Sequence, residues 1–154
     1  IQFPIQAEGE DITPEALNQI VTLTKGYPYY LQEWGYNAWN VTESSPININ
    51  DLDSASKAAL KRLDDGFFRV RFDRLTPKER EYVLAMADLG EGPYRSSDIA
   101  DALGVKPETL GPRRAKIIHK GMIYSPSYGD IDFTVPMFDD YLNRNYQADG
   151  TAKP

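Results

Sequence analysis

The chain contains no cysteine and only one histidine, His119. Without cysteine there can be no disulfide, no thiolate nucleophile and no cysteine-ligated zinc, and a lone histidine cannot build a histidine-rich metal site. We therefore expect no metal to be bound by this chain. No apolar run approaches the ~18–20 residues that a membrane span needs, so we also expect no membrane partner and a cytoplasmic location.

The motifs of nucleotide hydrolysis are also missing. No G-x-x-x-x-G-K-[ST] run is present, and no acid follows an apolar strand in the manner of a Walker B motif. We expect that this chain does not hydrolyse ATP by itself. A Ser-His-Asp arrangement can be drawn from His119, Ser125 and Asp130, but no context orients the histidine, so no catalytic residue is predicted.

Acidic residues dominate the first half of the chain. Residues 1–65 carry ten acids and four bases, residues 66–154 carry thirteen of each, and the net charge of the whole chain is −6. This balance argues against loose, charge-driven binding of nucleic acid. Basic side chains nevertheless gather in one short segment, where a single acid, Glu108, accompanies Lys106, Arg113, Arg114, Lys116 and Lys120.

The first half of the chain shows the signals of three helices. Thr13-Pro14-Glu15 combines a capping hydroxyl, a proline for the first helical position and an acid for the first turn, and Gly26 closes this helix. Pro28 opens a second helix. Asn50 caps a third, which Gly66 ends or kinks before further helix follows.

Aromatic residues are dense in the second of these helices. Its predicted inner face consists of Tyr27, Leu31, Trp34 and Ala38. Tyr29 and Tyr36 fall on the outer face, where we expect contact with another domain. We place a domain boundary near Asp73–Thr76, which divides the chain into residues 1–74 and residues 75–154.

The second half carries start and stop signals in an informative order. Three helices are predicted, from Thr76-Pro77 to near Gly90, from Ser97-Asp98-Ile99 to Gly104, and from about Lys106 to Lys120. Two strands, Met122–Ser125 and Ile131–Val135, follow around a turn. This order resembles a winged-helix domain and predicts a mainly α fold with a small β-hairpin. The third helix of such domains most often lies in the DNA major groove, although the same fold also docks proteins.

The third predicted helix has one basic face. Its members are Thr109, Arg113, Lys116 and Lys120, and the adjacent stripe of Leu110, Arg114, Ile117 and Gly121 is expected to face the core. A proline inside a helix costs roughly 3 kcal/mol. Pro112 therefore favours a late start, with Thr109 as the N-cap.

We predict that this basic face binds DNA, because arginine and lysine on a recognition helix contact phosphates or guanine edges. Tyr128, on the turn between the two strands, is a further candidate contact. Asp130 and Asp132 on the same hairpin would repel phosphates, so binding is expected to be weak and strongly dependent on salt.

Two stretches together resemble the C-terminal part of an AAA-type P-loop ATPase of the origin-recognition-like bacterial and archaeal kind. Residues 24–32, T-K-G-Y-P-Y-Y-L-Q, are similar to the T-x-G-x-P-x-x-L element in the helical lids of such ATPases. Residues 72–80, F-D-R-L-T-P-K-E-R, lead into the winged unit and on to K-G-M-I-Y at residues 120–124. The resemblance covers nearly the whole chain and implies a lid followed by a winged helix.

The resemblance implies that Gly26, Tyr27 and Pro28 lie against the adenine of bound ATP. The nucleotide would be held by an N-terminal P-loop domain of the same protein, and the chain departs from the family in having no arginine near Tyr29 or Tyr30 to reach the γ-phosphate. The same three residues also fit a plain reading as a helix stop and start.

Two other functions remain open. The winged helix could serve as a protein-interaction module of a signalling ATPase that does not bind DNA. Alternatively, the chain could be a free-standing transcription regulator in which residues 1–74 sense a ligand or dimerise, and a deep apolar pocket there would favour this function.

Overall fold

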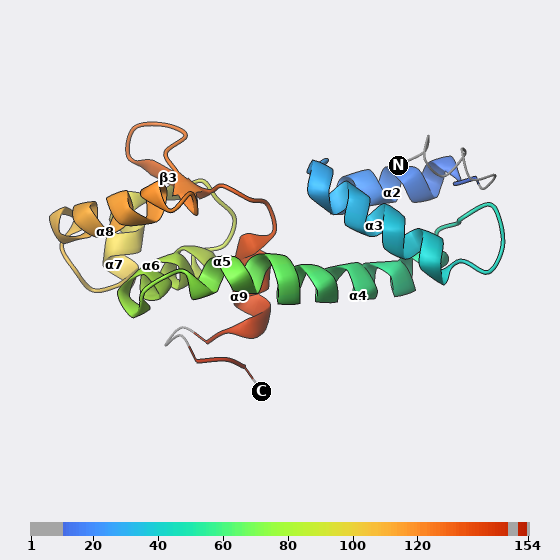
Figure 1. The fold of residues 1–154 in the computed structure, drawn as a ribbon. Helices are drawn as coiled ribbons and strands as arrows, with labels where there is room; N and C mark the ends of the chain where they lie inside the picture. The colour runs from blue at the N-terminus through green and yellow to red at the C-terminus, as the bar shows by residue number, and fades with distance from the viewer. Residues whose placement is uncertain (1–10, 148–150, 154) are drawn as a thin grey trace. The chain divides into compact units, whose positions relative to one another are not determined.

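The computed structural model describes residues 11–147 and 151–153. The chain forms two compact units, Ile1–Gly66 and Phe67–Pro154, and each is treated by itself (Figure 1). The described residues are mainly helical with one small antiparallel sheet, which confirms the predicted fold class. No helix among them is long and apolar enough to cross a membrane.

The described residues of the first unit form the helices α2 (Pro14–Leu23), α3 (Pro28–Val41) and α4 (Asp51–Leu63). The predicted start of α2 is confirmed, because the Thr13 hydroxyl accepts a hydrogen bond from the Ala16 amide (3.2 Å). The helix ends at Leu23 with Thr24 as its C-cap, so Gly26 lies one residue further from the helix than predicted, and Lys25 (φ +49°) and Gly26 (φ +70°) turn the chain away from it. α3 packs along α4.

Large side chains on α3 form the core of the first unit. Trp34 is fully buried, with its indole N–H donating to the Ser56 hydroxyl on α4 (3.0 Å). Ala38 is buried and Tyr29 and Tyr36 are exposed, as expected from the sequence. Tyr30 is also fully buried, which the predicted inner face missed, and its ring lies on that of the half-buried Tyr27.

Gly66 lies in a π-helical turn, Asp64–Phe68 (η1), and α5 (Arg69–Asp73) follows. The chain therefore stays helical past Gly66. The sequence predicts that Gly66 either ends the helix or kinks it before further helix follows, and the helix does not end there. Phe68 packs on Phe138 and Tyr141 of the second unit. These contacts explain why the units divide after Gly66, earlier than the boundary that the sequence suggested near Asp73–Thr76.

After α5, the described residues of the second unit form four helices and three short strands. In chain order they are α6 (Pro77–Asp88), β1 (Tyr94–Arg95), α7 (Ser96–Ala102), α8 (Pro107–His119), β2 (Ile123–Tyr124), β3 (Asp130–Phe133) and α9 (Phe138–Asn145). The strands form an antiparallel sheet in the order β1-β3-β2. Strand β1 was not predicted from the sequence. It pairs with β3 at Tyr94 and Ile131, and the Tyr94 hydroxyl donates to the Gly90 carbonyl (2.8 Å).

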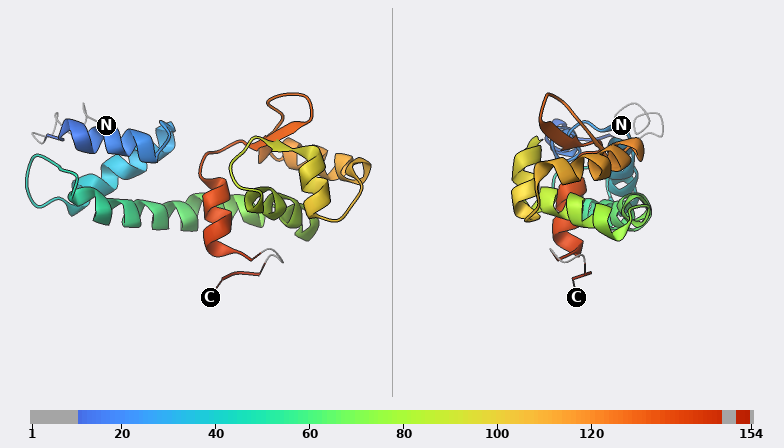
Figure 2. Two further views of the ribbon diagram at one scale, coloured as in Figure 1. Left: turned by 180° about the vertical axis from the view of Figure 1, so that it is seen from behind. Right: turned by 90° about the vertical axis from the view of Figure 1, so that its left-hand side faces the viewer.

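Helix α6 is the centre of the second unit. Its residues from Tyr82 to Ala87 are all buried, and α9 packs against it (Figure 2). Phe138 of α9 is fully buried between Phe68 and Phe133. Helix α9 was not predicted from the sequence, although it supplies much of this aromatic core.

The predicted start of α8 is wrong. The helix begins at Pro107, not after Thr109, and Pro112 lies inside it. Proline suits the first helical position, and the Thr109 hydroxyl donates back to the Lys106 carbonyl (2.7 Å) instead of capping the next turn. Pro112 removes only the bond to the Glu108 carbonyl, and both residues are exposed, so water can satisfy that group.

Candidate functional site

An open groove lies between the first turn of α6 and one face of α8, with a volume of about 680 Å³. Both walls belong to the second unit. The lining residues are Thr76, Lys78 and Glu79 from α6, and Thr109, Pro112, Arg113, Ala115, Lys116, His119 and Lys120 from α8 and its end. Basic residues predominate here, although the chain as a whole is acidic.

The α6 wall is fixed by a capping box. The Thr76 hydroxyl accepts from the Glu79 amide, while the Glu79 carboxylate accepts from the Thr76 amide (2.8 Å). Only 4% of the Glu79 side chain is exposed. A buried carboxylate needs partners to stay charged, and the cap supplies the first of them.

Lys120 is the second partner of Glu79. Its ammonium donates to the Glu79 carboxylate (2.6 Å) and to the Arg74 carbonyl (2.9 Å), and 28% of its side chain is exposed. Burial opposes the charged form of Glu79, but the bonds from Lys120 and Thr76 prevail and lower the pKa of that carboxyl. Lys120, expected to bind DNA, is thus engaged in an intramolecular ion pair.

Arg113 and Lys116 differ from Lys120 in this respect. Arg113 is half-buried and Lys116 is exposed, and both line the groove. Within the described ranges, neither side chain makes a hydrogen bond or an ion pair to a protein group. Lys78, on the opposite wall, pairs with Glu81 (2.8 Å), but this pair is exposed and readily exchanged. Arg113 and Lys116 are therefore available to a ligand without the loss of an ion pair that the structure describes.

The core-facing stripe of α8 is largely as predicted. Leu110 and Ile117 are buried. Arg114 is half-buried, and its guanidinium donates to the Ser96 hydroxyl at the start of α7 (3.0 Å). Arg114 therefore braces α8 against α7 and is turned away from the groove lining.

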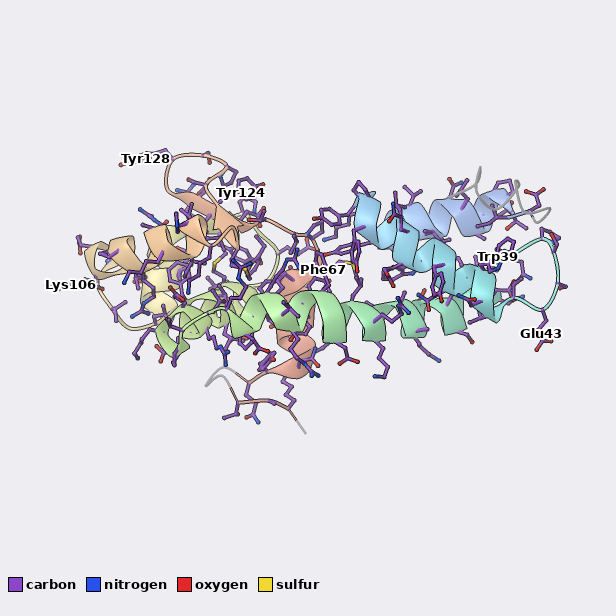
Figure 3. All side chains as sticks on the ribbon, viewed as in Figure 1. Trp39, Glu43, Phe67, Lys106, Tyr124 and Tyr128 are labelled. Atoms are coloured by element: carbon purple, nitrogen blue, oxygen red, sulfur yellow. The ribbon has the colours of Figure 1, made fainter. Side chains whose placement is uncertain are left out.

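The loop between β2 and β3 presents Tyr128 to solvent. The tyrosine is fully exposed at the tip of the loop (Figure 3), and it does not line the groove. The Ser125 hydroxyl donates to the Asp130 carbonyl (2.9 Å) and the Ser127 hydroxyl to the Asp130 carboxylate (2.6 Å). Ser125 thus closes a turn, and nothing in its contacts resembles a nucleophile held by His119.

Gly26, Tyr27 and Pro28 form the turn between α2 and α3. The Gly26 amide donates to the Val21 carbonyl (3.1 Å) and the Tyr27 amide to the Thr24 carbonyl (2.9 Å). Gly26 and Pro28 are exposed and Tyr27 is half-buried. These bonds account for a helix stop and start, and they leave the outer surface of the turn open.

The first unit has a groove of its own, which sequence reasoning missed. It has a volume of about 550 Å³ and is lined by Tyr29, Glu33, Lys61, Arg62, Asp65 and Gly66. Its charges are paired internally, Arg62 with Glu33 and Lys61 with Asp65, both at 2.9 Å. The Arg62 guanidinium also lies over the Tyr36 ring. The residues come from α3, from the end of α4 and from the start of η1, so only a folded structure brings them together.

Among the residues that the structure describes, no cluster of histidine, aspartate and glutamate is placed to hold a metal ion. Fold and site together define a mainly helical domain with a three-stranded antiparallel sheet and a basic groove between α6 and α8.

The chain belongs to the family described as a domain of unknown function, DUF8462, which matches residues 65–142, just over half of its length. The match contains every residue that lines the α8 groove and none of the α2–α3 turn. No curated protein and no solved structure matches the chain.

Proposed function

We propose that the second unit is a winged-helix domain that docks on duplex DNA through α8. The order α6, β1, α7, α8, β2, β3 supports the fold assignment, because it places two helices and a turn before a β-hairpin. The observation that carries the functional part is the pair Arg113 and Lys116. They lie one turn apart on one helix face, beside an open groove, and in the part of the chain that the structure describes neither side chain is in an ion pair.

Phosphate oxygens are the natural ligands of such a pair. Arginine and lysine supply much of the contact to DNA backbones, and the resulting affinity falls with salt as counterions are released. With Lys120 engaged by Glu79, two phosphate contacts give a slope of log K against log salt of about −1.8. The chain's net charge of −6 opposes binding further, so we expect weak, non-specific affinity.

Charge reversal tests this function. Arg113→Glu with Lys116→Glu should abolish binding of a fluorescent duplex, measured by anisotropy at low salt. The matched control is Lys25→Glu with Lys57→Glu, which changes the net charge equally at exposed positions of the first unit. Binding that survives the α8 reversal, or that the control abolishes equally, would contradict docking through α8.

We further propose that the first unit is the lid of an AAA-type ATPase, in which an N-terminal P-loop domain of the same protein binds ATP. The T-x-G-x-P-x-x-L order of residues 24–31 supports this function, as does the open outer surface of the turn at Gly26 and Pro28. Those residues and Tyr27 would cover the adenine. A cytoplasmic location belongs to the same proposal, because ATP and DNA are both available there.

One observation favours protein docking as a second candidate. The loop that would form the wing carries exposed Tyr128 and Tyr124, with Asp130 and Asp132 beside them. Exposed tyrosines are common in protein interfaces, whereas carboxylates repel phosphates. Because Tyr128 does not line the α8 groove, docking through α8 does not use the DNA contact that the sequence suggested for it. Tyr128→Ala therefore separates the two functions, because it should weaken a protein contact and leave the duplex affinity that Arg113 and Lys116 provide unchanged.

A further inference from the structure

The Lys120–Glu79 ion pair joins two segments that lie 41 residues apart in sequence. Glu79 belongs to the first turn of α6, and Lys120 is the C-cap of α8. The same ammonium reaches the Arg74 carbonyl just before α6. One side chain thus ties the end of α8 to the start of α6, and both segments are walls of the α8 groove.

The ion pair between Lys120 and Glu79 fixes where the basic face of α8 lies relative to α6. Lys116 and Arg113 precede Lys120 by one and two turns of the same helix, so all three side chains share a face. At a rise of about 1.5 Å per residue, Arg113 lies roughly 10 Å along the axis from Lys120. A change in the tilt of α8 at its tethered end therefore moves both free cations relative to α6.

We propose that Lys120 is a positioning residue, which works with Glu79 to set the angle of α8 and so the placement of Arg113 and Lys116, and which does not itself bind phosphate. This inference rests on the proposed DNA docking. A phosphate that captured Lys120 would leave the Glu79 carboxylate buried without its ammonium partner, which is strongly unfavourable. The lowered pKa of Glu79 agrees with a carboxylate that stays charged at neutral pH.

The salt dependence of duplex binding distinguishes a positioning residue from a phosphate ligand. Lys116→Gln should reduce the magnitude of the slope of log K against log salt by about 0.9, because one counterion-releasing contact is lost. Lys120→Met should weaken binding roughly fivefold, a modest coupling between separate sites, with the slope unchanged. A slope that falls by about 0.9 in Lys120→Met would overturn the inference.

Two further variants of the full chain separate positioning from simple loss of stability. Glu79→Gln should reproduce the loss of affinity and the unchanged slope of Lys120→Met, and the double variant should be no weaker than either. Asn143→Ala removes a bond from α9 to the Ala87 carbonyl at the far end of α6 (3.1 Å). This control should lower the melting temperature. At a temperature where all variants are folded, it should leave duplex affinity unchanged. An equal loss of affinity in this control would refute positioning.

Melting temperatures test the link between Lys120 and Glu79 even if the chain does not bind DNA. If the losses of melting temperature in Lys120→Met and Glu79→Gln are less than additive in the double variant, the ion pair between Lys120 and Glu79 (the tether) exists. If the wild-type chain nevertheless fails to bind duplex, both the DNA function and the positioning role are overturned. If the two losses simply add, the tether itself is refuted, whatever the chain binds.

Discussion

The groove of the first unit and the α8 groove of the second use charge in opposite ways. In the first unit, Arg62 and Lys61 are each paired with a carboxylate of the same groove. In the second, Lys120 is paired with a buried carboxylate and Lys78 with the exposed Glu81, whereas among the described residues the side chains of Arg113 and Lys116 have no ion-pair partner. Exposed pairs contribute little to stability and leave no net charge for a ligand. The contrast identifies the α8 groove, and not its counterpart, as the one suited to anions.

The largest expected effect is a loss of folding stability when the aromatic core of the second unit is disrupted. Phe138→Ala should destabilise the second unit by about 3–5 kcal/mol, because a fully buried aromatic side chain leaves a cavity against α6 and the sheet. Hydrogen exchange in urea should accelerate in α6 and α9. Tyr128→Ala is the matched control and should change stability by less than about 0.5 kcal/mol, since Tyr128 is fully exposed. Similar losses in both would contradict the described core.

The second effect compares the ion pairs of the two units directly. Glu79→Gln should cost about 2 kcal/mol, because a buried charged hydrogen bond is lost while the capping geometry is kept. Glu33→Gln should cost less than Glu79→Gln, since its partner Arg62 is mostly exposed. Chemical denaturation of the two variants measures the difference, and equal costs would show that burial does not separate the two pairs.

The third effect is the pH dependence of the stability that Glu79→Gln loses relative to the wild type. The pKa of Glu79 is lowered in the folded chain, so the carboxylate contributes its stability fully above the ordinary glutamate pKa of about 4.3. This contribution is lost as the pH falls through the lowered folded value. The gap in unfolding free energy between wild type and Glu79→Gln should therefore be constant near neutrality and close below about pH 4. A gap that closes instead between pH 5 and 7 would contradict the assigned charge state.

The smallest expected effect is the binding of ATP to this chain. We expect none that calorimetry can measure, because the backbone amides of a phosphate loop are missing from the sequence. The turn at Gly26 and Pro28 could cover an adenine but could not hold the phosphates. Micromolar affinity for ATP would show that the first unit binds nucleotide in a different way from the lid that we propose.

Local signals in the sequence predicted most helix boundaries. Thr13, Thr76 and Gly121 act within one turn of the helix end that they mark, so their residue types suffice. The start of α8 was misjudged because two local rules conflicted there. The preference of Pro107 for a first helical position outweighed the cost of the interior Pro112.

Features that depend on distant residues could not be predicted in the same way. Strand β1 has only two residues, which is too short for an alternating pattern, and it exists because Tyr94 pairs with Ile131. The basic face was found from helical spacing, but spacing could not show that Lys120 is held by Glu79. The sequence therefore located the candidate site and overestimated its free charge.

The central claim is that Arg113 and Lys116 are the cations through which this chain contacts duplex DNA. Anisotropy titrations of a labelled duplex over a series of low salt concentrations test it most directly. The account predicts a slope of log K against log salt of about −1.8 for the wild type and no binding after reversal of both charges. A duplex that does not bind at the lowest salt, or that binds the reversed variant equally well, would contradict it.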